Sequence, residues 1–228
     1  MGNKKISKRT KVVIIASGGM DSTTLLYDIL AQGYEVYVLS INYNQKHSKE
    51  LGFIRKTCNK LKIPYKIIDL SRVGKELLFV SALTADKINI PELNYKEKNM
   101  RLTVVPNRNM ILLSLAAGYA ISLGAKKVFY GAHAGDHALY PDCRKEFVRA
   151  MRKVISLADW KPVTLEAPYL NLTKDDILMR GNDLGVDYAL TWSCYQGRQK
   201  PCGKCGTCRE RLKAFKKIGI KDPLKYEK

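Results

Sequence analysis

Acidic residues and long apolar runs are both scarce in this chain of 228 residues. It carries 21 Asp and Glu against 40 Lys and Arg, which gives a formal net charge of +19. The longest apolar stretch, Met110 to Leu123, is interrupted by Ser114 and Gly118, so it predicts a buried helix and not a membrane span. The basic N-terminal segment has no apolar core and no small-residue cleavage site, which argues against a signal peptide. We therefore expect a cytoplasmic protein.

The basic surplus is concentrated near the two ends of the chain. Residues 1–11 contain five Lys or Arg and no acid, and residues 198–228 contain eleven against three acids. Such a balance is typical of proteins that bind nucleic acid or another anion, but a lysine-rich solvated surface has the same composition. Aromatic residues are not interleaved with the basic groups as in single-strand binding surfaces. Nucleic-acid binding therefore stays open, and no other feature requires it.

No internal repeat and no low-complexity linker interrupts the chain, and strand-like runs alternate with helix-like segments. This alternation predicts an α/β fold with a parallel sheet and helices on both faces, Rossmann-like, in which ligands bind beyond the carboxyl ends of the strands. We assign residues 1–190 to this domain, with an irregular polar insertion at about 80–103, and residues 191–228 to a small C-terminal module. The expected strands are Val12–Ala16, Glu35–Ile41, Tyr65–Leu70, Lys127–Gly131 and Val163–Ala167. The expected helices are Ser22–Gln32, 47–61, Asn109–Leu123, Arg144–Leu157 and Thr173–Leu184.

A glycine-containing loop follows the first strand directly and opens the first helix. It reads Ser17-Gly18-Gly19-Met20-Asp21-Ser22-Thr23-Thr24, and no G-x-x-x-x-G-K-[ST] P-loop is present. The two glycines allow the backbone N–H groups to turn inward, and the helix N-terminus adds its positive dipole. The loop therefore predicts a phosphate site, although a plain strand-to-helix turn capped by Ser or Asp would have a similar sequence.

Four of the six cysteines are crowded into residues 194–208, whereas Cys58 and Cys143 stand apart. The crowded ones are Cys194, Cys202, Cys205 and Cys208. Their spacing suits a closed tetrahedral zinc site of structural role, and iron–sulfur ligation is the alternative. Disulfides are disfavoured in the reducing compartment that we expect.

The S-G-G-x-D-S pattern resembles the signature of the PP-loop ATP pyrophosphatases, and the chain as a whole resembles the 7-cyano-7-deazaguanine synthase (QueC) family. The resemblance runs from about Val12 to Phe215. Its most specific part is Tyr140-Pro141-Asp142-Cys143-Arg144-Lys145-Glu146-Phe147, and Thr191-Trp192-Ser193-Cys194-Tyr195 is similar to the lead-in to the first zinc cysteine. Val105-Pro106-Asn107-Arg108-Asn109 is similar to the family's V-P-G-R-N, with Asn for Gly.

A second departure is Asn42-Tyr43-Asn44-Gln45-Lys46-His47, where the family has a pattern close to D-Y-G-Q-R-H. Asn tolerates a left-handed backbone better than most residues, so we expect Asn44 and Asn107 to keep the turns. The carboxylate missing at Asn42 could alter metal or nucleotide contacts, or mark a relative that acts on another acceptor.

The resemblance implies an ATP-dependent carbon–nitrogen ligase that converts 7-carboxy-7-deazaguanine and ammonia into 7-cyano-7-deazaguanine through adenylated intermediates, in queuosine biosynthesis. It implies one structural zinc per chain, ATP as a co-substrate and Mg²⁺ with the phosphates. We expect a homodimer without a membrane partner. No glutaminase domain is evident, so ammonia is expected to be taken up free.

The expected site residues fall into three groups. The nucleotide site comprises Ala16, Ser17, Gly18, Gly19, Met20, Asp21, Ser22, Thr23, Thr24, Leu25 and Leu26. The catalytic candidates are Asp21, Ser22, Arg108 and Asp142. The substrate end comprises Asp136, His137, Tyr140, Asp142 and Arg144. Arg108 is expected to bind a phosphate or the substrate carboxylate, unless it forms a surface ion pair, and Asp142 is expected to accept from the guanine-like edge.

Three other functions stay open at this point. A PP-loop enzyme that adenylates tRNA directly would explain the basic ends of the chain. A zinc-bearing protein without catalysis could have kept the fold, although its intact S-G-G-M-D-S loop argues against that. A family relative could join a deazapurine to a different acceptor.

Overall fold

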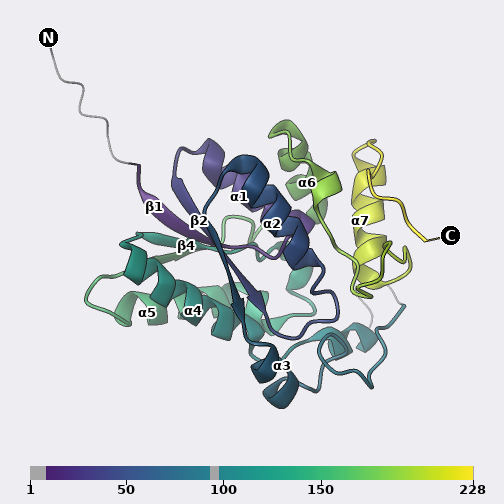
Figure 1. Ribbon diagram of the computed structural model, residues 1–228, viewed down its shortest axis with the longest axis horizontal. Coiled ribbons are helices and arrows are strands. Elements are labelled where there is room, and N and C mark those ends of the chain that lie inside the picture. Colours follow the sequence, from purple (N-terminus) through teal and green to yellow (C-terminus); the bar gives the residue numbers. More distant parts are fainter. Residues whose placement is uncertain (1–8, 93–97, 228) are drawn as a thin grey trace, which may run out of the picture.

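The computed structural model describes residues 9–92 and 98–227 as five parallel strands with helices on both sides (Figure 1). The strands are β1 Lys11–Ile15, β2 Glu35–Asn42, β3 Tyr65–Asp69, β4 Lys127–Phe129 and β5 Thr164–Glu166. The α-helices are α1 Met20–Ala31, α2 Glu50–Leu61, α3 Ser71–Leu77, α4 Arg108–Leu123, α5 Lys145–Leu157, α6 Lys174–Asp183 and α7 Gly206–Lys217. This confirms the predicted fold class.

The strand order is β3-β2-β1-β4-β5, and every pairing is parallel. In register, Val13 lies beside Tyr37 of β2 and Val128 of β4. The chain runs outward in one direction through β2 and β3 and in the other through β4 and β5, so the order reverses at the β1–β4 junction. Open α/β sheets place their ligand crevice beyond the strand carboxyl ends at such a junction.

Successive residues of β1 pack on opposite faces of the sheet because side chains alternate along a strand. Val12 and Ile14 join the core made by α1, α2 and α6, whereas Val13 joins the core made by α4 and α5. Figure 1 shows α1 and α2 on one side of the sheet and α4 and α5 on the other. All three side chains are fully buried, as a near-continuous apolar run in a doubly covered parallel sheet requires.

The differences from the expected elements are local. Helix α1 begins at Met20 and not at Ser22, because Gly19 already has the extended backbone of an N-cap residue. Helix α3 was not expected. The predicted irregular insertion is largely turns but contains a short 3₁₀ helix, Lys98–Thr103, and part of it, 93–97, lies outside the described residues.

The C-terminal residues pack directly against the α/β sheet domain. The backbone N–H of Trp192 donates to the carbonyl of Gly18 at 2.9 Å, and α7 lies beside α6 (Figure 1). Arg211 of α7 is buried and holds Asp222 with two hydrogen bonds of 2.8 and 3.0 Å. The boundary between residues 190 and 191 stays a prediction. No helix in the described part of the chain is long and apolar enough to cross a membrane.

Candidate active site and metal centre

A cavity of about 240 Å³ opens at the carboxyl ends of β1 and β4, at the junction where the strand order reverses. Its walls combine the loop after β1, the residues after β4, the start of α4, the start of α6 and part of the C-terminal module. The expected residues that line it are Ala16, Ser17, Gly19, Met20, Asp21, Ser22, Arg108, Asp136 and Tyr140. The fold therefore brings the loop and the Tyr140 segment to one place.

The loop after β1 is held in a tight turn by its own hydroxyl groups. The N–H of Ser17 donates to Oγ of Ser22, and the N–H of Gly19 donates to Oγ of Ser17, both at 3.2 Å. Ser22 Oγ in turn donates to the carbonyl of Gly19 at 3.3 Å. These bonds fix the loop at the N-terminus of α1, where the helix dipole favours an anion.

Gly18 is the residue that permits the loop to touch α2. Its φ of +95° is in the left-handed region, and a Cβ at this position would lie 2.3 Å from the carbonyl oxygen of Glu50 and 2.8 Å from the nitrogen of Ile54. Both neighbours are backbone atoms and cannot turn away. No other residue type fits this position, and the glycine lets the loop backbone rest directly on the backbone of α2.

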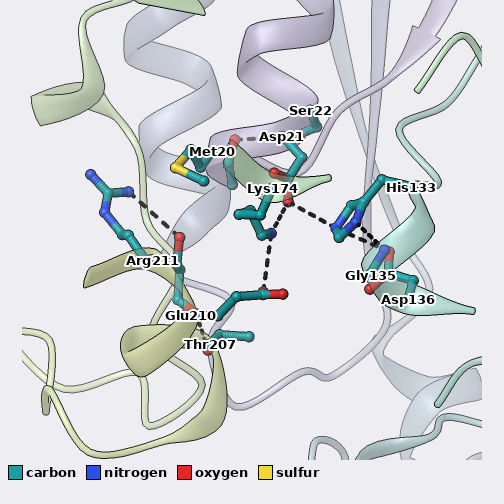
Figure 2. A network of polar contacts seen from close by, with 12 residues as sticks. Met20, Asp21, Ser22, His133, Gly135, Asp136, Lys174, Thr207, Glu210 and Arg211 are labelled. Carbon is teal, nitrogen blue, oxygen red and sulfur yellow. Dashed lines mark hydrogen bonds and ion pairs between the residues drawn. The ribbon is translucent and has the colours of Figure 1, made fainter. Parts of the chain in front are cut away.

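Asp21 is the centre of a charged network beside the loop (Figure 2). Nζ of Lys174 lies 2.6 Å from Asp21 Oδ2 and 3.3 Å from Glu210 Oε2, so the lysine joins α1 to α7. Burial by itself would raise the pKa of Asp21, but the charges of Lys174 and His133 outweigh it and lower that pKa. The pKa of Lys174 is raised, since its two carboxylate partners outweigh its burial. Asp21 and Lys174 are therefore both ionised.

The position of Lys174 follows from the sequence just before it. Thr173 is the N-cap of α6 and forms a capping box with Asp176, in which each residue's side chain accepts from the other's backbone N–H. Lys174 is the first residue of the helix, so the cap fixes the backbone from which its side chain extends into the cavity. The Thr173-x-x-Asp176 sequence is a local signal for this cap, but the role of Lys174 was not predicted.

His133 lies on the other side of Asp21, as Figure 2 shows. Its Nδ1 accepts from the backbone N–H of Gly135 at 3.1 Å, so Nε2 is the ring nitrogen that faces the carboxylates. Nε2 lies 3.4 Å from Asp136 Oδ2 and 3.7 Å from Asp21 Oδ2. The ring therefore links the two carboxylates along the cavity wall.

Glu50 and His47 form a buried pair beneath the loop. Burial raises the pKa of Glu50 to about 8, against hydrogen bonds from Gln45 and Ser17 that act the other way. Burial, followed by the charge of Arg108, lowers the pKa of His47 to about 3. His47 Nε2 and Glu50 Oε1 lie 3.5 Å apart, and both groups are neutral near pH 7, so this is a contact between neutral groups and not an ion pair.

Arg108 and several tyrosines line the part of the cavity at the start of α4. The guanidinium Nε donates to Asn109 Oδ1 at 3.2 Å, and the guanidinium carbon lies 5.8 Å from the ring centre of Tyr140. The Tyr140 hydroxyl lies 2.9 Å from Thr103 Oγ1 and 3.1 Å from the Tyr195 hydroxyl. These contacts give the guanidinium a fixed orientation against an aromatic wall.

Several residues expected in the site lie outside the cavity lining. Thr23, Thr24, Leu25 and Leu26 are buried in α1, and Gly18 faces α2. Asp142 Oδ2 accepts from the backbone N–H of Asn109 at 3.0 Å, so this carboxylate caps the first turn of α4. Arg144 is exposed and donates from Nε to the carbonyl of His137 at 2.9 Å. The functional roles expected for these residues stay predictions.

Asn44 and Asn107 have φ angles of 64° and 55°, which confirms that both keep the left-handed turn where the family has glycine. The Asn42 amide donates to Asp69 Oδ1 at 3.3 Å, and its carbonyl oxygen accepts from the N–H of Asn44. Asn42 does not line the cavity, so its side chain supports the turn after β2.

Sequence reasoning missed the groups that come from distant elements. These are Tyr43, Glu50, Tyr130, His133, Lys174, Tyr195, Thr207 and Arg211, all of which line the cavity, together with Glu210 beside Lys174. The capping box gave a local signal for the position of Lys174, whereas Glu210 looks like an ordinary helix residue. Only the packing of α7 on α6 places it there.

The four clustered cysteines converge on one buried point. Their ligand atoms all lie within 4.8 Å of one another, which suits a metal ion such as zinc; the residues are Cys194, Cys202, Cys205 and Cys208. Backbone N–H groups point at two of the sulfurs: that of residue 202 at Cys194 Sγ, and those of residues 204 and 205 at Cys202 Sγ, at 3.3–3.4 Å. Such donors stabilise thiolates, so the surroundings fit a tetrathiolate site.

Comparison with known proteins agrees with this geometry. Residues 11–219 match the family model described as "Queuosine biosynthesis protein QueC". Proteins named 7-cyano-7-deazaguanine synthase are 62% identical in Caldicellulosiruptor bescii, over 95% of this chain and 97% of that one, and 57% identical in Methanoregula boonei, over 95% and 99%. The solved NMN synthetase from Francisella tularensis is 14% identical, with a TM-score of 0.49 over 92% of this chain and 77% of that one, a likeness too distant to bear on activity. The family match and the near full-length identities establish that this chain belongs to the QueC family.

Proposed function

We propose that this protein makes 7-cyano-7-deazaguanine, the product in the names of its relatives, from 7-carboxy-7-deazaguanine and ammonia with ATP. The observation that best supports this is one cavity lined both by the Ser17–Ser22 loop and by the family-specific segment at Tyr140 and Cys143. A phosphate-binding loop and a family-specific wall in one cavity suit a reaction between a nucleotide and a particular acceptor.

The chemistry requires two activations, because two oxygens must be made into leaving groups. In the first, a carboxylate oxygen attacks the α-phosphorus of ATP and releases pyrophosphate. Ammonia then attacks the acyl carbon and displaces AMP, which leaves the amide and a proton. In the second activation, the amide oxygen attacks the α-phosphorus of another ATP and releases pyrophosphate, and loss of AMP and of the two N–H protons yields the nitrile.

The chain contributes mainly positioning and charge to these steps. Backbone N–H groups of the loop and the N-terminus of α1 face the phosphates, and Ser17 and Ser22 hold the loop in that shape. Lys174 contacts Asp21 at the start of α1. We assign to Lys174 the stabilisation of the negative charge that develops on the departing pyrophosphate. The ionised Asp21 keeps Lys174 charged and aimed into the cavity.

The remaining components belong to the same proposal. Mg²⁺ would bind with the phosphates, and we assign to it the Asp21 Oδ1 atom, which is buried and has no hydrogen-bond partner among the described residues. Ammonia is taken up free. The metal at the four cysteines is one structural zinc, since a Cys₄ site leaves no open position. We also expect a homodimer in the cytoplasm, with no requirement for nucleic acid.

The test is a full product balance with purified protein, 7-carboxy-7-deazaguanine, ATP and ammonium. We expect the nitrile by mass spectrometry, with two AMP and two pyrophosphate per nitrile and no ADP. The variants Asp21→Asn and Ser17→Ala should lower turnover more than stability. Stoichiometric ADP would contradict adenylation, and an amide end product with one AMP would favour a relative with a different product. Activity only with added tRNA would favour direct tRNA adenylation.

A further inference from the structure

Three cationic side chains line the cavity in the described part of the chain: Arg108, Lys174 and Arg211. Two of them already contact carboxylates. Lys174 contacts the carboxylates of Asp21 and Glu210, and Arg211 holds the carboxylate of Asp222 through Nε and Nη2. Both of these cations therefore have acidic partners before any ligand enters.

Arg108 differs from the other two cations of the wall. Among the described residues, no ion pair of 4.0 Å or less joins a carboxylate to its guanidinium. Asp142 lies outside the cavity lining; its charge is among those that raise the pKa of Arg108 against burial, but its Oδ2 accepts from the backbone N–H of Asn109. The neutral partners of Arg108 are the Asn109 amide oxygen, the Tyr43 hydroxyl and the face of the Tyr140 ring. They orient the guanidinium without cancelling its charge.

We propose that Arg108 is the carboxylate-binding residue of the first activation, an inference that rests on the proposed function. A carboxylate that enters this cavity loses water and needs a cation in return. The planar guanidinium matches a carboxylate with two parallel N–H donors. Of the three lining cations, Arg108 is the one that no carboxylate contacts among the described residues. We assign the phosphates to the loop N–H groups and to Lys174, which lies beside the loop at Asp21.

The proposal separates the two half-reactions. The substrate of the first is an anion, whereas the amide that enters the second is neutral at the same carbon. Arg108 therefore contributes a charge-assisted interaction to the first half-reaction only. A guanidinium that bound phosphate would contribute to both, because each half-reaction consumes one ATP.

The experiment assays Arg108→Gln on each substrate alone: the acid with ATP and ammonium, and the amide with ATP only. We expect kcat/KM for the acid to fall roughly 10- to 150-fold, as for a lost hydrogen bond to a charged group, and kcat/KM for the amide to stay within about threefold. Arg108→Lys keeps the charge but lacks the planar pair of donors, so its kcat/KM for the acid should lie between those of Arg108→Gln and wild type. Equal loss on both substrates would overturn the proposal in favour of phosphate binding.

Two controls and one binding measurement complete the design. Arg101→Gln removes an exposed cation nearby and should leave both half-reactions unchanged, whereas Ser17→Ala should impair both. Calorimetry without ATP should show weaker binding of the acid, and unchanged binding of the amide, to Arg108→Gln. Equal affinity of wild type and variant for the acid would also overturn the proposal. A wild-type protein that converts neither compound overturns the proposed function itself, and this inference with it.

Discussion

At the scale of single residues, the least ordinary feature of the site is a neutral carboxyl group under the phosphate loop. Glu50 is buried, and its carboxyl contacts Gln45, His47 and Ser17. A buried carboxylate without a cation is costly, so the fold keeps this one protonated near pH 7. The residue is therefore ionised in the unfolded chain and neutral in the folded one, which makes stability depend on pH.

We predict that Glu50→Gln removes a loss of stability that the wild type shows as pH rises through neutrality. The folded pKa of Glu50, about 8, lies above its ordinary value of 4.5, so unfolding releases a proton within this window. Stability must then fall as pH rises from about 4.5 to 8. Between pH 6 and 7.5, urea unfolding should show the wild type losing about 2 kcal/mol more than the variant. The exposed Glu76→Gln should behave as wild type, and parallel curves for Glu50→Gln would contradict the neutral carboxyl.

Lys174 offers a second prediction at this scale. Replacing it with Gln leaves the carboxylates of Asp21 and Glu210 without their shared cation and removes the charge assigned to pyrophosphate. Turnover should fall roughly 100-fold, as for other preorganised groups that stabilise developing charge. The rate of pyrophosphate release measures this turnover. The matched control is Lys217→Gln, which breaks the exposed α6–α7 ion pair with Asp175 and should keep wild-type turnover; equal rates in both variants would argue against the role of Lys174.

At the scale of elements, the loop after β1 depends on α2 as much as on its own sequence. The backbone of Gly18 approaches that of Glu50 and Ile54 more closely than any side chain would allow. The orientation of the loop N–H groups therefore depends on α2, which follows β2 in the chain. The loop and α2 meet backbone to backbone, with no room for a side chain on Gly18.

Gly18→Ala and Gly33→Ala separate crowding from backbone strain. Both glycines have positive φ, +95° and +84°, but a Cβ on Gly33 meets nothing within 4 Å. Gly33→Ala should cost about 1–2 kcal/mol of stability from the left-handed backbone alone and leave turnover intact. Gly18→Ala should cost more and should also raise KM for ATP, because the loop must move off α2. Thermal unfolding and ATP kinetics measure both effects, and similar behaviour of the two variants would show that the contact with α2 is unimportant.

At the scale of the whole molecule, the cysteine module forms part of the active-site wall. Helix α7 begins one residue after Cys205, and it contributes Thr207 and Arg211 to the cavity and Glu210 to Lys174. The cysteine cluster therefore lies at the start of a helix whose other residues line the candidate cavity. The cluster and the cavity share one element.

Removal of the metal should accordingly abolish activity together with stability. We expect one zinc per chain by elemental analysis. Cys205→Ser should lose the zinc and unfold at lower temperature, because apparent zinc binding of about 10–16 kcal/mol is partly folding energy. Cys58→Ser, at a buried cysteine outside the cluster, should keep the zinc. Iron with inorganic sulfide in place of zinc would identify a cluster, and full activity of metal-free protein would refute the link.

The chain's own pattern determined the fold class, the phosphate loop and the cysteine site, because each is a local signal. Apolar runs such as Val12–Ala16 specify a buried strand, two glycines specify a tight turn, and four closely spaced cysteines specify a metal site. The left-handed backbone of Asn44 and Asn107 could also be predicted from the sequence, since this conformation depends on the type of a single residue. Five parallel strands and helices on both faces followed from alternation alone.

Only the tertiary structure decided which charged groups meet in the cavity. Lys174 is 153 residues from Asp21, and Glu210 comes from another helix again. The Asp142 carboxylate accepts from a backbone N–H of α4, so no acid contacts Arg108 among the described residues, while the substrate role expected for Asp142 stays a prediction. Side-chain pairing depends on how separate elements pack, and no spacing along the chain encodes that. The sequence determined where the candidate cavity lies because strand ends are local, whereas the balance of charge around it is set by contacts between distant helices.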